Sequence, residues 1–163
     1  EIRQLPANEY DKALDLSLDV SSNAEERISM KRGWKLSRIS FIITTRNELT
    51  FYGAFDGESL IGVIATKNEG KHISLFFIKP SYHGRGIGKQ LFKTAILNQP
   101  VSEMTVNSSS YAIPIYRKLG FEPVCEEQVM HGMKYTPMKR TNIMNIFYHN
   151  KNHPNKLEIN HYI

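Results

Sequence analysis

Residues 83–89, with the sequence HGRGIGK, combine alternating glycines with two cations, a pattern suited to binding an anion. The glycines are Gly84, Gly86 and Gly88, and the cations are Arg85 and Lys89. Glycine adopts backbone angles that other residues avoid and lets a ligand approach the main chain. A helical pattern follows directly, so the loop N–H groups would lie unpaired at the positive end of a helix. The segment predicts a cradle for phosphate or pyrophosphate; a glycine-rich turn without a ligand is the alternative.

Two common phosphate-binding motifs do not match this loop. A Walker A loop requires Ser or Thr after its lysine to bind magnesium, and here Gln90 follows Lys89. The dinucleotide fingerprint is G-x-G-x-x-G after a strand, whereas this loop is G-x-G-x-G. The start of the chain also shows no strand pattern that could open a Rossmann unit. We therefore expect neither a P-loop NTPase nor a Rossmann enzyme.

The chain ahead of the loop predicts helix first and strands second. Asn8 is a candidate helix N-cap, and residues 21–23 (Ser-Ser-Asn) indicate a break before a second helical stretch. Apolar and aromatic runs between turn signals predict strands at 49–54, 60–66 and 72–78, with turns at Asp56-Gly57 and 68–70. The last of these strands is nearly continuously apolar, so we expect it to be central and covered on both faces.

The chain after the loop predicts a helix over 89–98, a strand at 104–106, a helix over 112–119 capped by Gly120, and one or two strands within 121–135. This order gives the α/β (or α+β) class with one mixed sheet. The composition changes from residue 141, since the last 23 residues hold six Asn and three His. We therefore expect a domain over residues 1–140 and a C-terminal extension over 141–163.

The loop and a second block at 116–121 (YRKLGF) resemble the GNAT superfamily of N-acetyltransferases. In that family, Gln/Arg-x-x-Gly-x-Gly/Ala opens the central helix and Tyr-x-x-Leu-Gly-Phe follows later. His83 stands here where the family usually has Gln or Arg. The order of elements matches over roughly residues 48–124. The resemblance implies a mostly antiparallel central sheet flanked by helices.

The resemblance also implies acetyl-CoA as co-substrate. We expect no metal, because the chain has one cysteine and His149, His153 and His161 are not at tight metal-ligand spacing. Carried over by motif position, the groups around its pyrophosphate would be the loop residues His83, Gly84, Arg85, Gly86, Gly88 and Lys89. The backbones of Phe76 and Ile78 would pair with the pantetheine arm as an added strand would. Asn107, in the next strand, would hydrogen-bond the same arm.

Acetyl transfer to an amine requires a proton acceptor, stabilisation of a developing oxyanion and protonation of the leaving sulfur. Tyr116 matches the family's usual acid toward that sulfur, and a phenol pKa of ~10 suits a thiolate. The alternative is a core aromatic residue. His72 stands eleven residues before His83, where histone-type members have Glu, and histidine titrates near neutral pH. A strand-edge polar role for His72, with ordered water as the base, is the alternative.

Composition limits the remaining function classes. The 163 residues suit one domain, and 40% hydrophobic with 23% charged residues is an ordinary globular balance. No apolar run approaches the ~20 residues of a membrane span, and the start of the chain has no leader pattern, so we expect a cytoplasmic protein. The single cysteine, Cys125, excludes an intrachain disulfide and is expected to be a small buried residue.

The acceptor is expected to be a small-molecule or peptide amine, and the protein a monomer or homodimer. In the family, the region holding Trp34 and Arg38 borders the acceptor site. The formal charge of +5 is too small and too dispersed to favour nucleic acid as the partner. Two competing hypotheses are a non-catalytic acyl-CoA-binding module and a regulatory or nucleic-acid-binding protein. The sequence leaves open an acyl group longer than acetyl.

Overall fold

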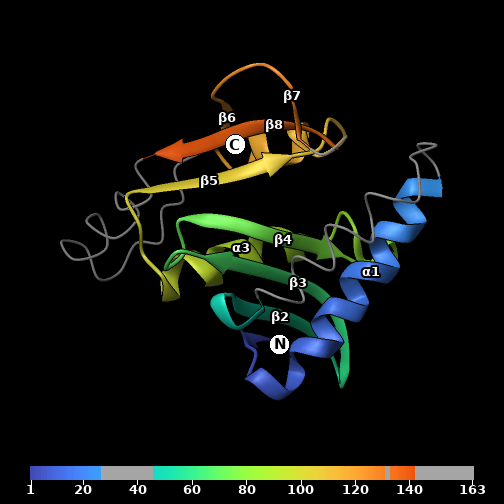
Figure 1. Ribbon diagram of the computed structural model, residues 1–163. Helices are drawn as coiled ribbons and strands as arrows, with labels where there is room; N and C mark the ends of the chain where they lie inside the picture. The colour runs from blue at the N-terminus through green and yellow to red at the C-terminus, as the bar shows by residue number, and fades with distance from the viewer. Residues whose placement is uncertain (27–45, 131–132, 142–163) are drawn as a thin grey trace.

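The computed structural model describes residues 1–26, 46–130 and 133–141 (Figure 1). The strands are β1 (Ile2–Gln4), β2 (Thr50–Asp56), β3 (Ser59–Lys67), β4 (His72–Ile78), β5 (Glu103–Ser108), β6 (Glu122–Pro123), β7 (Gln128–Met130) and β8 (Met133–Thr141). The α-helices are α1 (Tyr10–Glu26), α3 (Ile87–Asn98) and α4 (Ile113–Lys118). Short 3-10 turns lie at η1 (Ala7–Glu9), η2 (Arg46–Glu48) and η3 (Pro80–Tyr82). No helix in these ranges is long and apolar enough to cross a membrane.

The strands form one mixed, mostly antiparallel sheet in the order β1-β2-β3-β4-β5-β8-β6, with β7 also paired to β8. Only the β4–β5 pair is parallel among the described strands. The predicted fold class is therefore confirmed. The two-residue connection after Asp56 also lies where the Asp-Gly signal predicts a hairpin turn, with Gly57 at φ +57°.

Helices cover both faces of the sheet, and each face has its own core (Figure 1). The α1 face holds Leu14 and Leu16 against Phe51, Val63 and Leu75. The α3 face holds the apolar stripe of that helix, Leu91, Phe92, Ala95 and Ile96, against Ile64, Ile73 and Met104. β4 supplies Ile73 to one core and Leu75 to the other, which confirms the expectation of a central strand covered on both faces.

Five sequence predictions are wrong. Asn8 is not an N-cap but lies inside η1, whose N-cap is Pro6. Among the described residues, three strands, β6, β7 and β8, follow Gly120 instead of one or two, and β8 runs on to Thr141. The predicted break at residues 21–23 is absent, and α1 runs on to Glu26. Serine hydroxyls bond within this helix: Ser17 donates to the Ala13 carbonyl and Ser21 donates to the Leu18 carbonyl. A strand does stand at the start of the chain, β1, which pairs with β2. Cys125 is exposed rather than buried, because it lies in the connection between β6 and β7.

The second helical stretch, Trp34 and Arg38 lie outside the described residues, as does the extension after Thr141. The domain boundary and the position of the acceptor wall therefore stay predictions.

Candidate active site

The glycine loop connects β4 to α3. η3 follows β4 directly, and Gly86 is the N-cap of α3 in the left-handed conformation, with φ +75°. The amide of Gln90 donates to the Gly86 carbonyl at 3.1 Å, which closes the first helical turn. The amides before Gln90 have no carbonyl to bond within the helix, so they lie at its positive end as the sequence predicts.

The three glycines of the loop are not equivalent, because backbone conformation requires two of them and not the third. Gly84 and Gly86 have φ of +76° and +75°, which residues with a side chain rarely adopt. A Cβ at either position would meet nothing within 4 Å, so conformation alone requires glycine there. Gly88 lies inside α3, and a Cβ there would stand 3.6 Å from the Phe76 ring and 3.8 Å from Ile78. The start of α3 therefore packs directly on the carboxyl half of β4.

β4 and β5 pair over only two residues, His72 with Thr105 and Ile73 with Val106. Immediately beyond, Ser74 is an extra residue in β4, because Ala65 of β3 faces Leu75 while Thr66 faces Ile73. Such a bulge bends its strand and increases the local twist. β5 stays paired with β8 along its length, so the bulge separates β4 from β5 beyond Ile73. The carboxyl ends of these two strands lie apart in Figure 1.

This separation leaves the edge of β4 from Phe76 to Ile78 without a strand partner on the β5 side, among the residues that the structure describes. The Lys79 amide donates to the Ile61 carbonyl of β3 at 2.9 Å. Because alternate residues of a strand face the same neighbour, the N–H and C=O groups of Phe76 and Ile78 point away from β3. The two predicted pantetheine-binding positions thus lie on the free edge.

His83 contributes to this edge in a way that the sequence does not predict. Its Nε2 lies 2.8 Å from the Ile78 carbonyl oxygen, and the Nε2–H donates to that carbonyl. The imidazole therefore caps the last carbonyl of the free edge and ties the loop back to β4. It leaves the Phe76 groups and the Ile78 amide as the edge positions open to a ligand.

Tyr116, the predicted acid, lies on α4 and is 8% exposed. Its ring centroid is 6.3 Å from that of Phe76 and 5.6 Å from that of Phe121. Pro114 in the first turn and Gly120 at φ +84° delimit its short helix. The structure thus brings Tyr116 to the same side of β4 as the start of α3. The ring also packs among core aromatic residues, which is the alternative role given above.

His72 and Asn107 lie where β4 and β5 meet. His72 Nδ1 is 2.8 Å from the Thr105 hydroxyl, which also lies 3.2 Å from the Lys71 carbonyl oxygen. When Thr105 donates to that carbonyl, Nδ1 donates to Thr105 and Nε2 carries the basic lone pair. Asn107 is exposed and is the first residue of β5 beyond the last β4 pair.

Positive charge at the loop is not neutralised within the described residues, since neither Arg85 nor Lys89 forms an ion pair there. The Arg85 guanidinium carbon lies 4.9 Å from the centroid of the Tyr82 ring. The Tyr82 hydroxyl donates to Asp56 at 2.8 Å, and this hydrogen bond raises the pKa of the phenol. Neither Tyr82 nor Asp56 is predicted as a site residue from the sequence, because nothing in the order of residues shows that the hairpin turn lies beside the loop.

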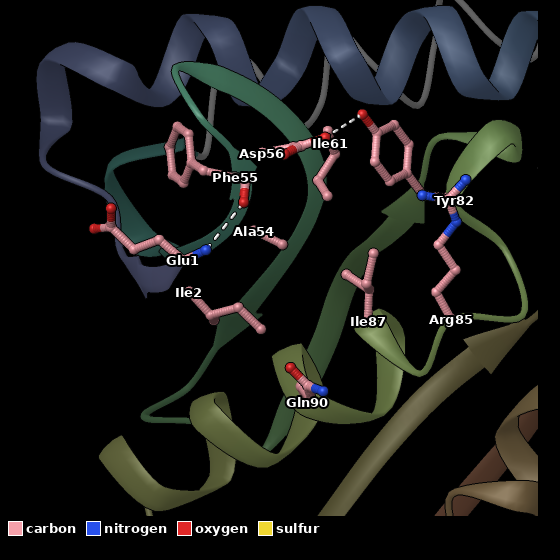
Figure 2. Close-up of a pocket in the computed structure, with 10 residues that line it drawn as sticks. All are labelled: Glu1, Ile2, Ala54, Phe55, Asp56, Ile61, Tyr82, Arg85, Ile87 and Gln90. Atoms are coloured by element: carbon pink, nitrogen blue, oxygen red, sulfur yellow. Dashed lines mark hydrogen bonds between the residues drawn. The ribbon is translucent and has the colours of Figure 1, made fainter.

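A pocket of about 260 Å³ lies beside the loop, between the start of α3 and the β1–β2 edge (Figure 2). Its lining includes Phe55, Asp56, Tyr82, Arg85 and Gln90. The pocket lies on the β1–β3 side of β4, with Ile61 of β3 in its lining, whereas the free edge of β4 faces β5, so we do not place the pantetheine arm in it. The described residues contain no group of three or more His, Cys, Asp or Glu that could hold a metal ion.

The model of the acetyltransferase (GNAT) domain family matches residues 36–142, which is most of the chain and includes β2 to β8. This protein belongs to the GNAT acetyltransferase family. The resemblance found in the sequence is thereby confirmed.

Related proteins and solved structures agree with this family. The chain is 34% identical over 58 residues to an uncharacterised N-acetyltransferase, YafP, of Escherichia coli, covering 36% of this chain and 37% of that protein. It is 34% identical over 61 residues to the peptidyl-lysine N-acetyltransferase YjaB of Salmonella typhimurium, covering 37% of this chain and 42% of that protein. The chain thus spans well under half of each of these curated relatives.

The GNAT fold is also shared with solved structures. A GCN5-related N-acetyltransferase from Rhodopseudomonas palustris superposes with a TM-score of 0.69 at 16% identity, covering 86% of this chain and 94% of that one. The PaiA N-acetyltransferase from Thermoplasma acidophilum, solved in complex with coenzyme A, superposes with a TM-score of 0.65 at 19% identity. The match covers 86% of this chain and 98% of that one.

Proposed function

We propose that this protein is an N-acetyltransferase that moves an acetyl group from acetyl-CoA to a primary amine by direct attack in a ternary complex. The observation that carries the proposal is the free edge of β4, which begins at the bulge and ends beside a helix N-terminus rich in glycine. An extended amide-containing arm fits the edge, and a pyrophosphate fits the helix start. Few other ligands carry both groups in one molecule.

The residues present fit acetyl-CoA at both ends. At the loop, amides at the start of α3 and the cations Arg85 and Lys89 favour an anion, and no described carboxylate pairs with those cations. At the edge, Phe76 offers both a donor and an acceptor, and Ile78 offers its amide. His83 holds the Ile78 carbonyl and so fixes which backbone groups remain for the arm.

Acetyl-CoA supplies an activated acyl group on a thiol that leaves more readily than an amine. Tyr116 is assigned the role of the acid that protonates the sulfur, because its ring lies beside that of Phe76, a residue of the free edge of β4. His72 is assigned the role of base, with Thr105 fixing its tautomer at the junction of β4 and β5. The single cysteine is far along the chain, in the β6–β7 connection, and we assign it no covalent role.

The first experiment is thermal unfolding with and without acetyl-CoA, with free CoA and ATP as comparison ligands. At about 100 times Kd, a single-site ligand stabilises by roughly 2.7 kcal/mol. For a domain of this size that corresponds to a rise of several degrees in Tm. We expect acetyl-CoA and CoA to raise Tm and ATP to leave it unchanged. No rise at saturating acetyl-CoA would refute the proposed function and favour a binding protein of another class.

The acceptor is then sought by measuring thiol release with a panel of amines. The panel includes lysine peptides, because the relative YjaB is a peptidyl-lysine N-acetyltransferase, together with polyamines and small primary amines. Amine-dependent thiol release establishes an enzyme. Tight CoA binding without release across the panel favours the non-catalytic acyl-CoA-binding alternative.

A further inference from the structure

In the described part of the chain, one side-chain hydrogen bond joins residues 80–86, which include the first half of the glycine loop, to a strand other than β4. The Tyr82 hydroxyl donates it to Asp56 Oδ2, at 2.8 Å. Asp56 ends β2 at the hairpin turn, 26 residues before Tyr82. Figure 2 shows this hydrogen bond spanning the pocket between the hairpin and η3.

Little else fixes the loop tip. Residues 83–86 are exposed, and side-chain atoms at Gly84 and Gly86 would find nothing within 4 Å. The remaining hydrogen bonds of the segment are local. The amides of Tyr82 and His83 donate to the carbonyls of Lys79 and Pro80, His83 Nε2 donates to Ile78, and the Gln90 amide donates to Gly86. Gly84 and Gly86, which both have positive φ, give the backbone of the tip access to other conformations. A neighbouring element must therefore restrain the tip if it is to keep one conformation.

Tyr82 also organises the charge of the tip. Its ring is partly buried against the α3-face core, and Arg85 lies over it at 4.9 Å from the centroid. A cation over an aromatic face is attracted by the ring quadrupole. Because the Asp56 hydrogen bond orients the ring, it also orients the guanidinium above the ring. The Tyr82 hydroxyl is the donor in this bond, and the bond raises the pKa of the phenol.

We propose that the Asp56–Tyr82 hydrogen bond and the Arg85 contact on the Tyr82 ring position the glycine loop for the phosphates of the CoA-type co-substrate. Asp56 and Tyr82 are positioning residues that act from the β2–β3 hairpin, and Arg85 is the charge that they place. This inference rests on the proposed function, because it takes the ligand of the loop to be CoA. The affinity for the pantetheine half of the ligand should not depend on this contact, since that half lies along β4.

The test compares affinities for CoA and for pantetheine, which lacks the phosphates. Calorimetry gives Kd for CoA, and ligand-observed NMR gives Kd for pantetheine. Tyr82→Phe keeps the ring beneath Arg85 and removes only the hydroxyl, and Asp56→Ala removes the acceptor. We expect each to weaken CoA binding 5- to 10-fold and to leave pantetheine binding within 2-fold. Asp56→Asn retains an acceptor oxygen and should restore CoA binding to within 2-fold of the original protein.

Glu58→Gln is the matched control, because Glu58 is an exposed carboxylate in the same hairpin turn. It should leave both affinities unchanged. Normal CoA binding by Tyr82→Phe and Asp56→Ala overturns the inference, and so does an equal loss for CoA and pantetheine, which indicates general damage to the fold. If Tyr82→Phe does not fold, the comparison of CoA affinity between Asp56→Ala and Asp56→Asn tests the inference in its place. If the unaltered protein binds no CoA, the proposed function fails as well, so the two failures are distinguishable.

Discussion

At the scale of single residues, the packing of Tyr116 and the catalytic role proposed for it belong to different parts of one side chain. The ring packs between Phe76 and Phe121, so the aromatic body belongs to the core. The hydroxyl is the group that the proposed chemistry uses. Substitutions that keep the ring therefore separate catalysis from packing.

Tyr116→Phe should fold normally and lose most of its activity. General acid catalysis contributes typically 10²–10⁴-fold, so we expect kcat to fall by about 100-fold or more with little change in the KM for acetyl-CoA. Thiol-release kinetics with the best amine of the panel measure this, and thermal unfolding is the control for the fold. An unchanged kcat would assign Tyr116 to packing alone.

His72 is tested by pH rather than by rate alone. If its imidazole accepts the amine proton, activity falls as pH drops through the pKa of this group, because the protonated form has no lone pair. His72→Ala should abolish that acid limb of the profile of kcat/KM. A profile of unchanged shape in the variant would assign the proton to water or to another group.

At the scale of elements, the strand-to-helix connection is set by backbone conformation more than by side-chain packing. Gly86 must be left-handed to cap α3, whereas Gly88 has ordinary helical geometry and space for a methyl group. The three glycines that look equivalent in the sequence therefore differ in what a substitution costs.

Gly86→Ala should destabilise the protein by about 1–2 kcal/mol, the cost of a left-handed residue with a side chain. Gly88→Ala should leave stability unchanged or raise it by up to ~1 kcal/mol, because alanine favours helix. Thermal unfolding of the two variants side by side measures the difference. Equal destabilisation would mean that the methyl group at Gly88 cannot be accommodated against Phe76.

The element scale also shows what the sequence can predict. Segments with strong periodicity, such as α3 and β4, are found with nearly correct bounds, because burial of one face or two faces leaves a clear pattern. β1 is only three residues long and its burial is partial, so no pattern marks it. Residues 21–23 have a composition typical of a break, and only the hydrogen bonds of the folded helix reveal the error there.

At the scale of the whole molecule, two cores on opposite faces hold β4 rigid while its β5-side edge stays open beyond Ile73. The glycine loop and Tyr116 could be predicted from local motifs, because those motifs lie within short segments. The Ser74 bulge, the His83 cap and the Asp56–Tyr82 hydrogen bond could not, because each depends on register or on contact between segments that the linear sequence does not reveal.

The open edge predicts a difference in amide exchange along β4. In the free protein, the amides of Phe76 and Ile78 should exchange with deuterium quickly, whereas those of Leu75 and Phe77, which face β3, should be protected. Saturating CoA should slow exchange at Phe76 and Ile78 at least 10-fold and leave the other two unchanged. Hydrogen exchange followed by NMR resolves the four sites, and protection of Phe76 in the free protein would contradict an open edge.

The proposed use of main-chain groups along β4 has a consequence for how this protein can diverge. Mutations rarely alter N–H and C=O groups, so a co-substrate site of this kind places few constraints on side-chain identity beyond the loop glycines. Solved structures with 14–22% identity nonetheless superpose on most of this chain. Drift in sequence is thus compatible with an unchanged fold. Under the proposed function, selection for an amine acceptor must act through side chains, so new acceptor preferences can arise without any change in the proposed donor site.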